Sequence, residues 1–286
     1  IRKKIKKIKK ISKKFTEDTH NKIVSKLNFK LTNDQNLSLL DINKDLKSKS
    51  KMFRLLQGDV GSGKTIVSLI SALSVIDSGF QVALMAPTEI LARQHYNLAK
   101  TLFPTNVSIE LLSSKSRNFE KKKIIKELKD NKIQMVFGTH AIFQKKIIFN
   151  NLGYIIIDEQ HKFGVRQRKL LSDKGGKNCD VLLMSATPIP RTLTMSVYGD
   201  MDVSIIKEKP SNRKEVKTYS KLESKIDDVI KFVKKEISEG NQIFWVCPLI
   251  EESKKIDHQS SVNKYEFLNK LFPNKVALLH GKIDND

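Results

Sequence analysis

Short apolar runs alternate with longer amphipathic stretches along the chain from Phe53 onward. The apolar runs predict strands at residues 53–57, 81–86, 107–112, 133–137, 154–158 and 181–185. Between them, apolar residues recur at the spacing of one helical face, as in residues 66–76, 90–102 and 119–128. Strands that are apolar at nearly every position and are separated by helices are typical of a parallel sheet covered on both faces. The pattern therefore predicts an α/β fold.

The segments on either side of this series have different patterns. In residues 1–14, isoleucines recur at helical spacing among lysines, which predicts a basic amphipathic helix. Its isoleucine stripe could pack on a domain, or the helix could contact DNA or a membrane surface. The pattern breaks around residues 210–213, and a second β/α series follows with strands predicted at 242–247 and 276–279. We therefore expect a basic linker helix over residues 1–27, one α/β domain over residues 28–209, and the start of another over residues 210–286.

Composition narrows the classes of protein to consider. Hydrophobic residues make up 39% of the 286 residues and charged residues 29%, which is typical of a globular protein. No apolar run approaches the ~20 residues of a membrane span, so we expect no membrane partner. The two cysteines, Cys179 and Cys247, lie far apart and form no metal-ligand pattern, which fits a reducing cytoplasm.

The formal net charge of +22 favours polyanionic partners such as nucleic acid. Most of this charge comes from lysine, however, and a lysine-rich solvated surface is an equally good explanation. Only eight residues are arginine. In a chain that otherwise uses lysine, a retained arginine such as Arg54 suggests a site that needs the planar guanidinium group.

The segment after the first predicted strand has the spacing of a phosphate-binding loop and is followed by a predicted helix. Its residues are Gly58, Asp59, Val60, Gly61, Ser62, Gly63, Lys64 and Thr65. Glycines let backbone N–H groups surround phosphates at the positive end of a helix. Lys64 would reach the β- and γ-phosphates, and the Thr65 hydroxyl would ligate Mg²⁺. The spacing and its context predict a nucleoside triphosphate site.

The predicted strand at residues 154–158 ends in two acids, Asp158 and Glu159. Ligands of open α/β sheets bind at the carboxyl ends of strands. Asp158 would hold Mg²⁺ through its water shell, and Glu159 would orient and deprotonate an attacking water. Together with the phosphate loop, these acids predict a nucleotide hydrolase, which could be a kinase, a transporter or a motor.

Further motifs distinguish between a kinase, a transporter and a motor. Asp158-Glu-Gln-His161 and Ser185-Ala-Thr-Pro-Ile-Pro-Arg-Thr192 resemble the superfamily-2 helicases. Residues 86–95 and 138–141 resemble motifs Ia and Ib of those proteins, and residues 29–35 resemble their adenine-reading segment, in which Thr32 can cap the next helix.

The resemblance implies a role for each matching residue. It adds His161 to the catalytic residues Lys64, Asp158 and Glu159, and it adds Phe29 and Gln35 to the ATP-binding residues. The residues that it assigns to DNA contact or to coupling with the ATP site are Pro87, Thr88, Arg93, Gly138, Thr139, His140, Arg166, Arg168, Ser185, Thr187 and Arg191.

Several segments narrow the resemblance to the RecG family of branched-DNA helicases. They are the phosphate loop, Ala-Pro-Thr-Glu-Ile-Leu-Ala, Asp-Glu-Gln-His-x-Phe-Gly-Val, Thr-Pro-Ile-Pro-Arg-Thr and Val246-Cys-Pro-Leu-Ile-Glu-Glu-Ser253. Transcription-repair coupling factors share the phosphate loop and the Pro-Ile-Pro-Arg-Thr segment, and they are the alternative among motors. An alternative of another class is a nucleic-acid-binding module that binds ATP without efficient turnover.

Resemblance to the RecG family implies a RecA-like first lobe, the start of a second RecA-like lobe, and ATP and Mg²⁺ as cofactors. The implied activity is translocation on double-stranded DNA that remodels stalled forks and Holliday junctions in recombination and repair. The implied location is the bacterial cytoplasm, at the nucleoid. Branched DNA is the implied partner, and single-stranded-DNA-binding protein is a candidate partner of the full-length protein. We expect the chain to be a piece of a longer protein, since the wedge domain and the later motifs of the second lobe have no counterpart in it.

Overall fold

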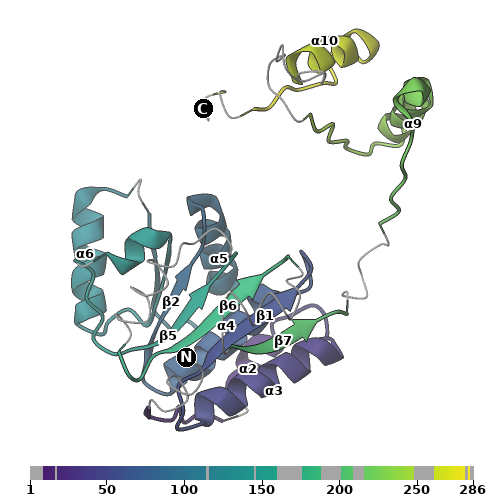
Figure 1. The fold of residues 1–286 in the computed structure, drawn as a ribbon. Coiled ribbons are helices and arrows are strands. Elements are labelled where there is room, and N and C mark those ends of the chain that lie inside the picture. The colour runs from purple at the N-terminus through teal and green to yellow at the C-terminus, as the bar shows by residue number, and fades with distance from the viewer. Residues whose placement is uncertain are drawn as a thin grey trace. The chain divides into compact units, whose positions relative to one another are not determined.

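The chain divides into two compact units, residues 1–214 and residues 215–286 (Figure 1). The structure is a computed structural model. It describes residues 9–16, 18–113, 116–144, 146–159, 176–187, 201–208, 216–247, 261–280 and 283. Among the helices in these ranges, none combines the length and apolar character needed to cross a bilayer.

The described residues of the first unit form a seven-stranded sheet in which every strand pair is parallel. Its strands, in the order β3-β4-β2-β5-β6-β1-β7, are β3 (Ile109–Leu112), β4 (Met135–Gly138), β2 (Gln81–Met85), β5 (Leu152–Ile157), β6 (Asp180–Ser185), β1 (Phe53–Gly58) and β7 (Asp202–Ile206). The first six correspond to predicted strands. The edge strand β7 was not predicted, because only two of its five residues are buried and its apolar pattern is weak.

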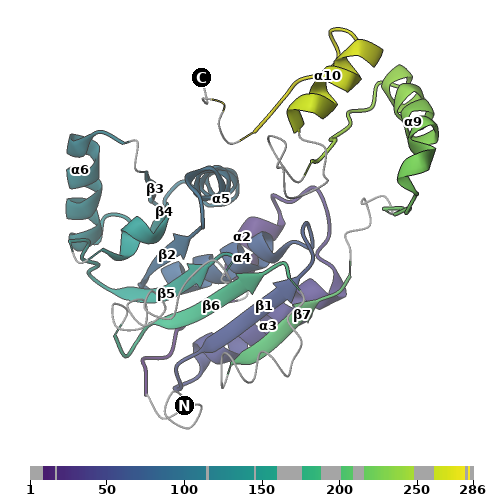
Figure 2. The same ribbon diagram turned by 45° about the horizontal axis from the view of Figure 1, so that its top comes forward.

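Helices cover both faces of this sheet (Figure 2). They are α2 (Asp18–Val24), α3 (Asn33–Lys47), α4 (Lys64–Asp77), α5 (Glu89–Leu102), α6 (Asn118–Lys129) and the short 3₁₀ helix η1 (His140–Phe143). Successive strand residues point to opposite faces, so Leu56 packs with α2, α3 and α4 in one core, whereas Leu55 faces the core that contains α6 and η1. The predicted α/β fold with helices on both faces is confirmed.

Residues 9–16 form no helix, so the helix predicted over residues 1–14 is not formed in that part; residues 1–8 lie outside the described residues. Ile11 is 59% exposed, whereas the side chains of Lys10 and Lys13 are buried. Both ammonium groups donate to the carboxylate of Asp180, the first residue of β6, at 2.6–2.7 Å. That carboxylate also accepts from the Met52 backbone N–H at 2.7 Å. A buried charge needs a charged or hydrogen-bonded partner, and this one lies too far along the chain for local periodicity to predict it.

Arg54 also has a structural role. Its guanidinium group is buried and donates to Asp45 and Asp41 on α3, at 2.9 and 3.3 Å, and to the Ser204 hydroxyl on β7 at 2.8 Å. The guanidinium group of Arg54 therefore joins α3 to the edge strand β7. In the part of the chain described, it forms no hydrogen bond with the phosphate loop.

The second unit contains α9 (Ile226–Ser238) and α10 (Ser261–Leu271), preceded by the 3₁₀ helix η3 (Glu223–Lys225). Val233, Leu268 and Phe272 form its small core. The strands predicted at 242–247 and 276–279 are not formed: neither segment has regular secondary structure or a strand partner among the described residues. Apolar side chains suggest a strand, but a strand also needs backbone groups of a neighbour to pair with.

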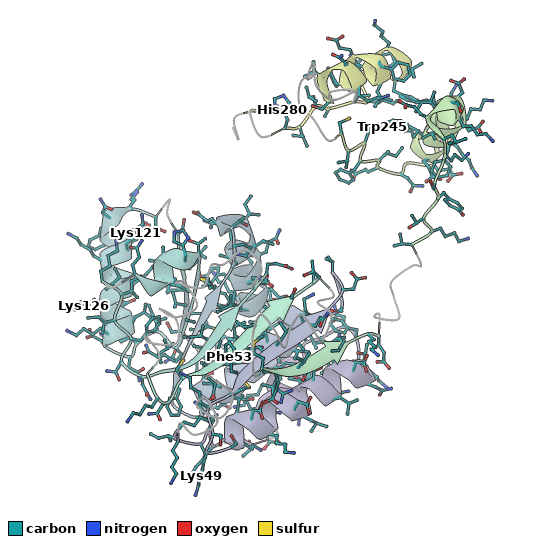
Figure 3. The ribbon with its side chains drawn as sticks, viewed as in Figure 1. Lys49, Phe53, Lys121, Lys126, Trp245 and His280 are labelled. Carbon is teal, nitrogen blue, oxygen red and sulfur yellow. The ribbon has the colours of Figure 1, made fainter. Side chains whose placement is uncertain are left out.

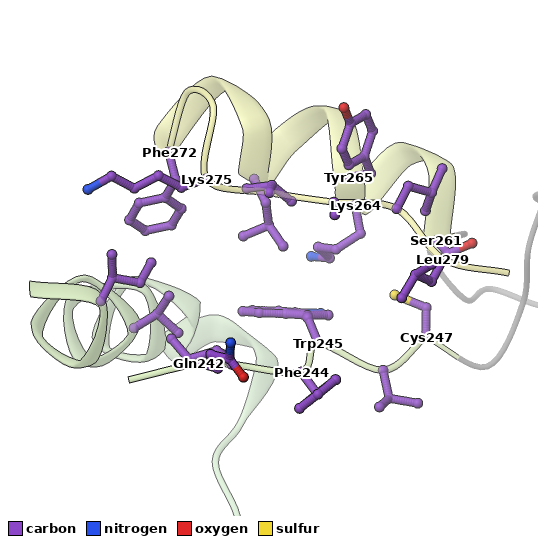
Figure 4. Close-up of a pocket in the computed structure, with 18 of the residues that line it drawn as sticks. Gln242, Phe244, Trp245, Cys247, Ser261, Lys264, Tyr265, Phe272, Lys275 and Leu279 are labelled. Carbon is purple, nitrogen blue, oxygen red and sulfur yellow. The ribbon is translucent and has the colours of Figure 1, made fainter. Parts of the chain in front are cut away.

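These extended segments and the two helices of the second unit line a cavity of about 780 Å³ (Figure 4). Trp245 lies on its wall, with the Lys264 ammonium 5.3 Å from the centre of the indole ring. The cavity contains no residue of the predicted ATP site. The assignment of residues 210–286 to a second helicase lobe stays a prediction.

Replacing Asp180 by alanine leaves the buried ammonium groups of Lys10 and Lys13 without their counter-charge. Breaking a buried ion pair by removing one partner costs about 3–5 kcal/mol, which corresponds to a fall of ~10 °C in thermal midpoint for a unit of this size. Asp130→Ala at the exposed end of α6 is the control, and we expect a change of at most ~2 °C. Calorimetry measures both, and equal midpoints for the two variants would contradict a stabilising role for the cluster.

Candidate active site

The predicted phosphate loop connects β1 to α4 at the carboxyl edge of the sheet. Gly61 and Gly63 have φ angles of 78° and 88°, in the left-handed region that only glycine enters without strain. A Cβ atom on Gly58 would lie 2.5 Å from the Ser62 hydroxyl oxygen and 3.0 Å from the Ile206 carbonyl oxygen. Glycine is therefore required where the loop turns and where it passes β7.

The loop leaves the first amides of α4 free of side-chain caps, because the N-cap residue is Gly63. Amides at a helix N-terminus carry partial positive charge and bind anions such as phosphate. The helix itself is buried from Ile66 to Val75. These amides are thus held on a helix that cannot shift without disturbing the core.

Lys64 lies inside the loop. Its ammonium group donates to the backbone carbonyls of Gly58 and Asp59 at 2.6 and 3.0 Å. Burial lowers the pKa of Lys64, and the negative charges of Asp158, Glu159 and Asp59 oppose that shift. Phosphate oxygens could replace the two carbonyls, since they are stronger acceptors for an ammonium group.

Gln35 braces the loop from the start of α3. As predicted, Thr32 caps this helix, and the two residues form a capping box: Gln35 N–H donates to the Thr32 hydroxyl at 3.3 Å, and Thr32 N–H to the Gln35 side chain at 2.9 Å. The Gln35 amide nitrogen then donates to the Ser62 carbonyl at 2.8 Å. Adenine reading by Gln35 and by Phe29, which is 42% exposed, stays a prediction.

Backbone hydrogen bonds join three of the predicted motifs at this edge. Ala86 N–H donates to the Gly138 carbonyl at 2.9 Å, and Asp158 N–H donates to the Met85 carbonyl at 2.8 Å. Both bonds continue the parallel ladders beyond the last paired residues of β2 and β5. The segments that resemble motifs Ia, Ib and II therefore begin side by side.

The carboxylate of Asp158 is held by two donors. One oxygen accepts from the Glu159 backbone N–H at 3.0 Å, and the other lies 2.8 Å from Nε2 of His95 on α5. Glu159 has a φ angle of 50°, a strained backbone conformation for a residue other than glycine, which persists only where the surrounding structure holds it.

His95 was not predicted as a site residue, although it ends the segment that resembles motif Ia. Its position on the buried face of α5 is the signal that could have identified it.

Ser185, at the end of β6, is in register with Gln57 on β1. Its hydroxyl lies 3.0 Å from that of Thr187, and the Gln57 side chain donates to the Thr187 carbonyl at 3.4 Å. These two residues are thus connected to the strand that leads into the phosphate loop.

The chain matches the DEAD/DEAH box helicase family over residues 32–196, more than half of its length. It belongs to this family. Among curated relatives, it is 51% identical to the ATP-dependent DNA helicase RecG of Aquifex aeolicus over 92% of the chain and 34% of that protein. It is 45% identical to RecG of Bacillus subtilis over 96% of the chain and 41% of that protein. The predicted homology to the RecG family is confirmed.

Solved structures agree with this assignment. A RecG bound to a three-way DNA junction matches this chain with a TM-score of 0.79 and 40% identity, over 94% of the chain and 35% of that structure. The DEAD-box helicase Mss116, bound to single-stranded RNA, matches with a TM-score of 0.58 and 18% identity, over 79% of the chain and 51% of that structure, which shows the shared fold. The chain spans about a third to two fifths of the length of the RecG proteins named here.

The predicted DNA-contacting residues of the chain differ in burial. The Thr88 hydroxyl caps α5 by accepting from Leu91 N–H at 3.3 Å, and exposed Arg93 forms a 3.6 Å ion pair with Glu89. Gly138 is packed so tightly that a Cβ atom would lie 2.9 Å from the Leu112 carbonyl oxygen. The remaining predicted residues of this group in described ranges are Pro87 before α5 and, at the start of η1, Thr139 and His140. His161, Arg166, Arg168 and Arg191 lie outside the described residues.

The residues predicted to hold Mg²⁺ fit that ion. Thr65 and Asp158 offer a hydroxyl and a carboxylate, and Mg²⁺ is usually held by one or two such oxygen ligands together with substrate phosphates and water. Within the described residues there is no cluster of three or more metal-ligating side chains, as a cage for a resident metal would require. Two oxygen donors suit an ion whose other ligands are phosphate oxygens and water.

Gly63→Ala should weaken nucleotide binding. A Cβ atom there would collide with the Gln35 amide nitrogen, so Gln35 must leave its hydrogen bond to the Ser62 carbonyl, and the φ angle of 88° is strained for alanine. We expect a fall of about tenfold or more in affinity for a fluorescent ATP analogue, equivalent to ~1.4 kcal/mol. Gly79→Ala is a matched control, since Gly79 has a φ angle of 81° but open space around it. The same affinity in both variants would contradict a special role for the geometry of the loop.

Proposed function

We propose that this helicase hydrolyses ATP to move along double-stranded DNA, and that the full-length protein remodels branched DNA such as stalled forks and Holliday junctions in recombination and repair. The observation that carries the proposal is the single sheet edge where Lys64, Asp158 and Glu159 meet, in a chain homologous to RecG helicases. The junction-bound RecG structure supports branched DNA as the substrate class.

In this proposal, Lys64 exchanges the Gly58 and Asp59 carbonyls for phosphate oxygens, and the amides at the start of α4 bind the same phosphates. Thr65 and Asp158 would hold Mg²⁺, and the ion would supply positive charge beside the phosphate that is transferred. Glu159, next along the chain, orients the attacking water and accepts its proton.

The Ser185–Thr187 pair is positioned to relay the state of the ATP site. It contacts Gln57 on β1, one residue before the phosphate loop, and by resemblance it adjoins the DNA track. Pro87, Thr88, Arg93 and residues 138–140 would contact the DNA at the same edge, with His161, Arg166, Arg168 and Arg191 completing the set. A net charge of +22 supports a polyanionic partner.

For the cell we propose a bacterial cytoplasmic, nucleoid-associated protein, with single-stranded-DNA-binding protein as a candidate partner. A transcription-repair coupling factor is not favoured, since the relatives named above are RecG helicases. A vestigial ATP site is not favoured either, because Lys64, Thr65, Asp158 and Glu159 are all present.

The test is Lys64→Ala in the full-length protein. Loss of the ammonium group removes its charge-assisted contacts to the phosphates, so ATP turnover with branched DNA should fall by about 10²–10³-fold or more. DNA binding should stay within about twofold, because Lys64 lies in the phosphate loop. Lys126→Ala, an exposed lysine on α6 (Figure 3), is the control for loss of one positive charge. Undiminished turnover in Lys64→Ala would refute the assignment.

A further inference from the structure

We propose that His95 is a positioning residue that holds the metal-binding carboxylate of Asp158 and makes it depend on the position of α5. DNA contact at the start of α5 and Mg²⁺-nucleotide binding at Asp158 would then influence each other. This inference rests on the proposed function, and it adds to it a specific route by which DNA stimulates the ATP site.

The contact between His95 and Asp158 is short and buried. Nε2 and Oδ2 are 2.8 Å apart, and the two side chains are only 10% and 11% exposed. A carboxylate can only accept, so the imidazole N–H is the donor. The contact therefore holds the carboxylate of Asp158 in place.

The other oxygen of Asp158 accepts from the Glu159 backbone N–H at 3.0 Å. With one donor on each oxygen, the plane of the carboxylate is fixed, whereas the terminal torsion of an aspartate is otherwise broad. The remaining lone pairs stay available for the metal-bound water shell. Losing His95 would free this torsion and leave the carboxylate to turn toward the positive charge of Lys64, which lies within its electrostatic reach.

His95 is held on α5 by its burial. It lies on the buried face of the helix with Ala92 and Ala99, and the neighbouring Tyr96 packs edge-on against Phe137 of β4 with ring centres 5.9 Å apart. A helix of this length is a stiff rod, so a displacement at its first turn is carried to His95, about 10 Å along the axis.

The first turn of α5 is where DNA is proposed to act. Thr88 caps the helix and Arg93 projects from it into solvent, and both are proposed DNA contacts. One helix therefore connects a DNA-contacting end to the carboxylate that would hold the water shell of the metal. Removing the hydrogen-bond partners that orient such groups around a metal site typically changes metal affinity by 10–100-fold.

The test uses the full-length protein with His95→Leu, His95→Gln and His95→Asn. The glutamine amide nitrogen can reach the position of Nε2, whereas the shorter asparagine amide cannot. Affinity for a fluorescent ADP analogue is titrated against Mg²⁺ and in EDTA, and ATP turnover is measured with and without branched DNA. Tyr96→Phe, which keeps the ring contact with Phe137, is the matched control on the same helix.

We expect His95→Leu and His95→Asn to raise the Mg²⁺ concentration for half-maximal nucleotide affinity by about tenfold or more and to reduce the stimulation by DNA. His95→Gln should recover most of both effects. Affinity in EDTA should not change in any variant, and Tyr96→Phe should match the wild type throughout.

Two results would overturn the inference. The first is that His95→Leu leaves the Mg²⁺ dependence of nucleotide affinity and the stimulation of turnover by DNA unchanged, while Lys64→Ala still abolishes turnover. The proposed function would then stand, and the role of His95 would not. The second applies if His95→Leu does not fold: equal behaviour of His95→Gln and His95→Asn would show that the donor position is irrelevant. If DNA fails to stimulate the wild type, the proposed function fails and the coupling to DNA fails with it.

Discussion

The parallel direction of the strands is the constraint on which the rest of this structure depends. In a parallel sheet all strands end at one edge, so the loops after β1, β2, β4, β5 and β6 meet there although they are dispersed along the chain. Two backbone hydrogen bonds beyond the paired residues, Asp158 to Met85 and Ala86 to Gly138, then fix the loops to one another. The phosphate loop, the acidic pair and the proposed DNA contacts come together because each follows a strand of this sheet.

Where the determining information was local, the sequence allowed accurate predictions. Six strands were predicted from apolar runs, because a strand that is buried on both faces is apolar at nearly every position. The cap of α3 was predicted from Thr32, because helix capping depends on residues within one turn. The pattern that predicts the phosphate loop is local as well, since its glycines, Lys64 and Thr65 are contiguous. The family assignment followed from short motifs of this kind.

Contacts between distant segments could not be predicted. The contact of the Gln35 amide with the Ser62 carbonyl was not predicted, and adenine reading by Gln35 stays a prediction. Lys10 and Lys13 looked like the polar side of a helix, yet they are buried on Asp180. The contact of His95 with Asp158 was not predicted, because the two residues are 63 positions apart in the sequence. In each case the role of a buried polar side chain depends on a hydrogen-bond partner that is distant in the sequence and close only in the folded chain.

The most direct test of the proposed ATP site is an experimental structure of the full-length protein with Mg²⁺ and a non-hydrolysable ATP analogue. The account predicts that the Lys64 ammonium leaves the carbonyls of Gly58 and Asp59 for phosphate oxygens. It also places the metal ion on the Thr65 hydroxyl beside Asp158, with His95 still bonded to that carboxylate. A nucleotide bound elsewhere, with Lys64 still on the two carbonyls, would contradict it.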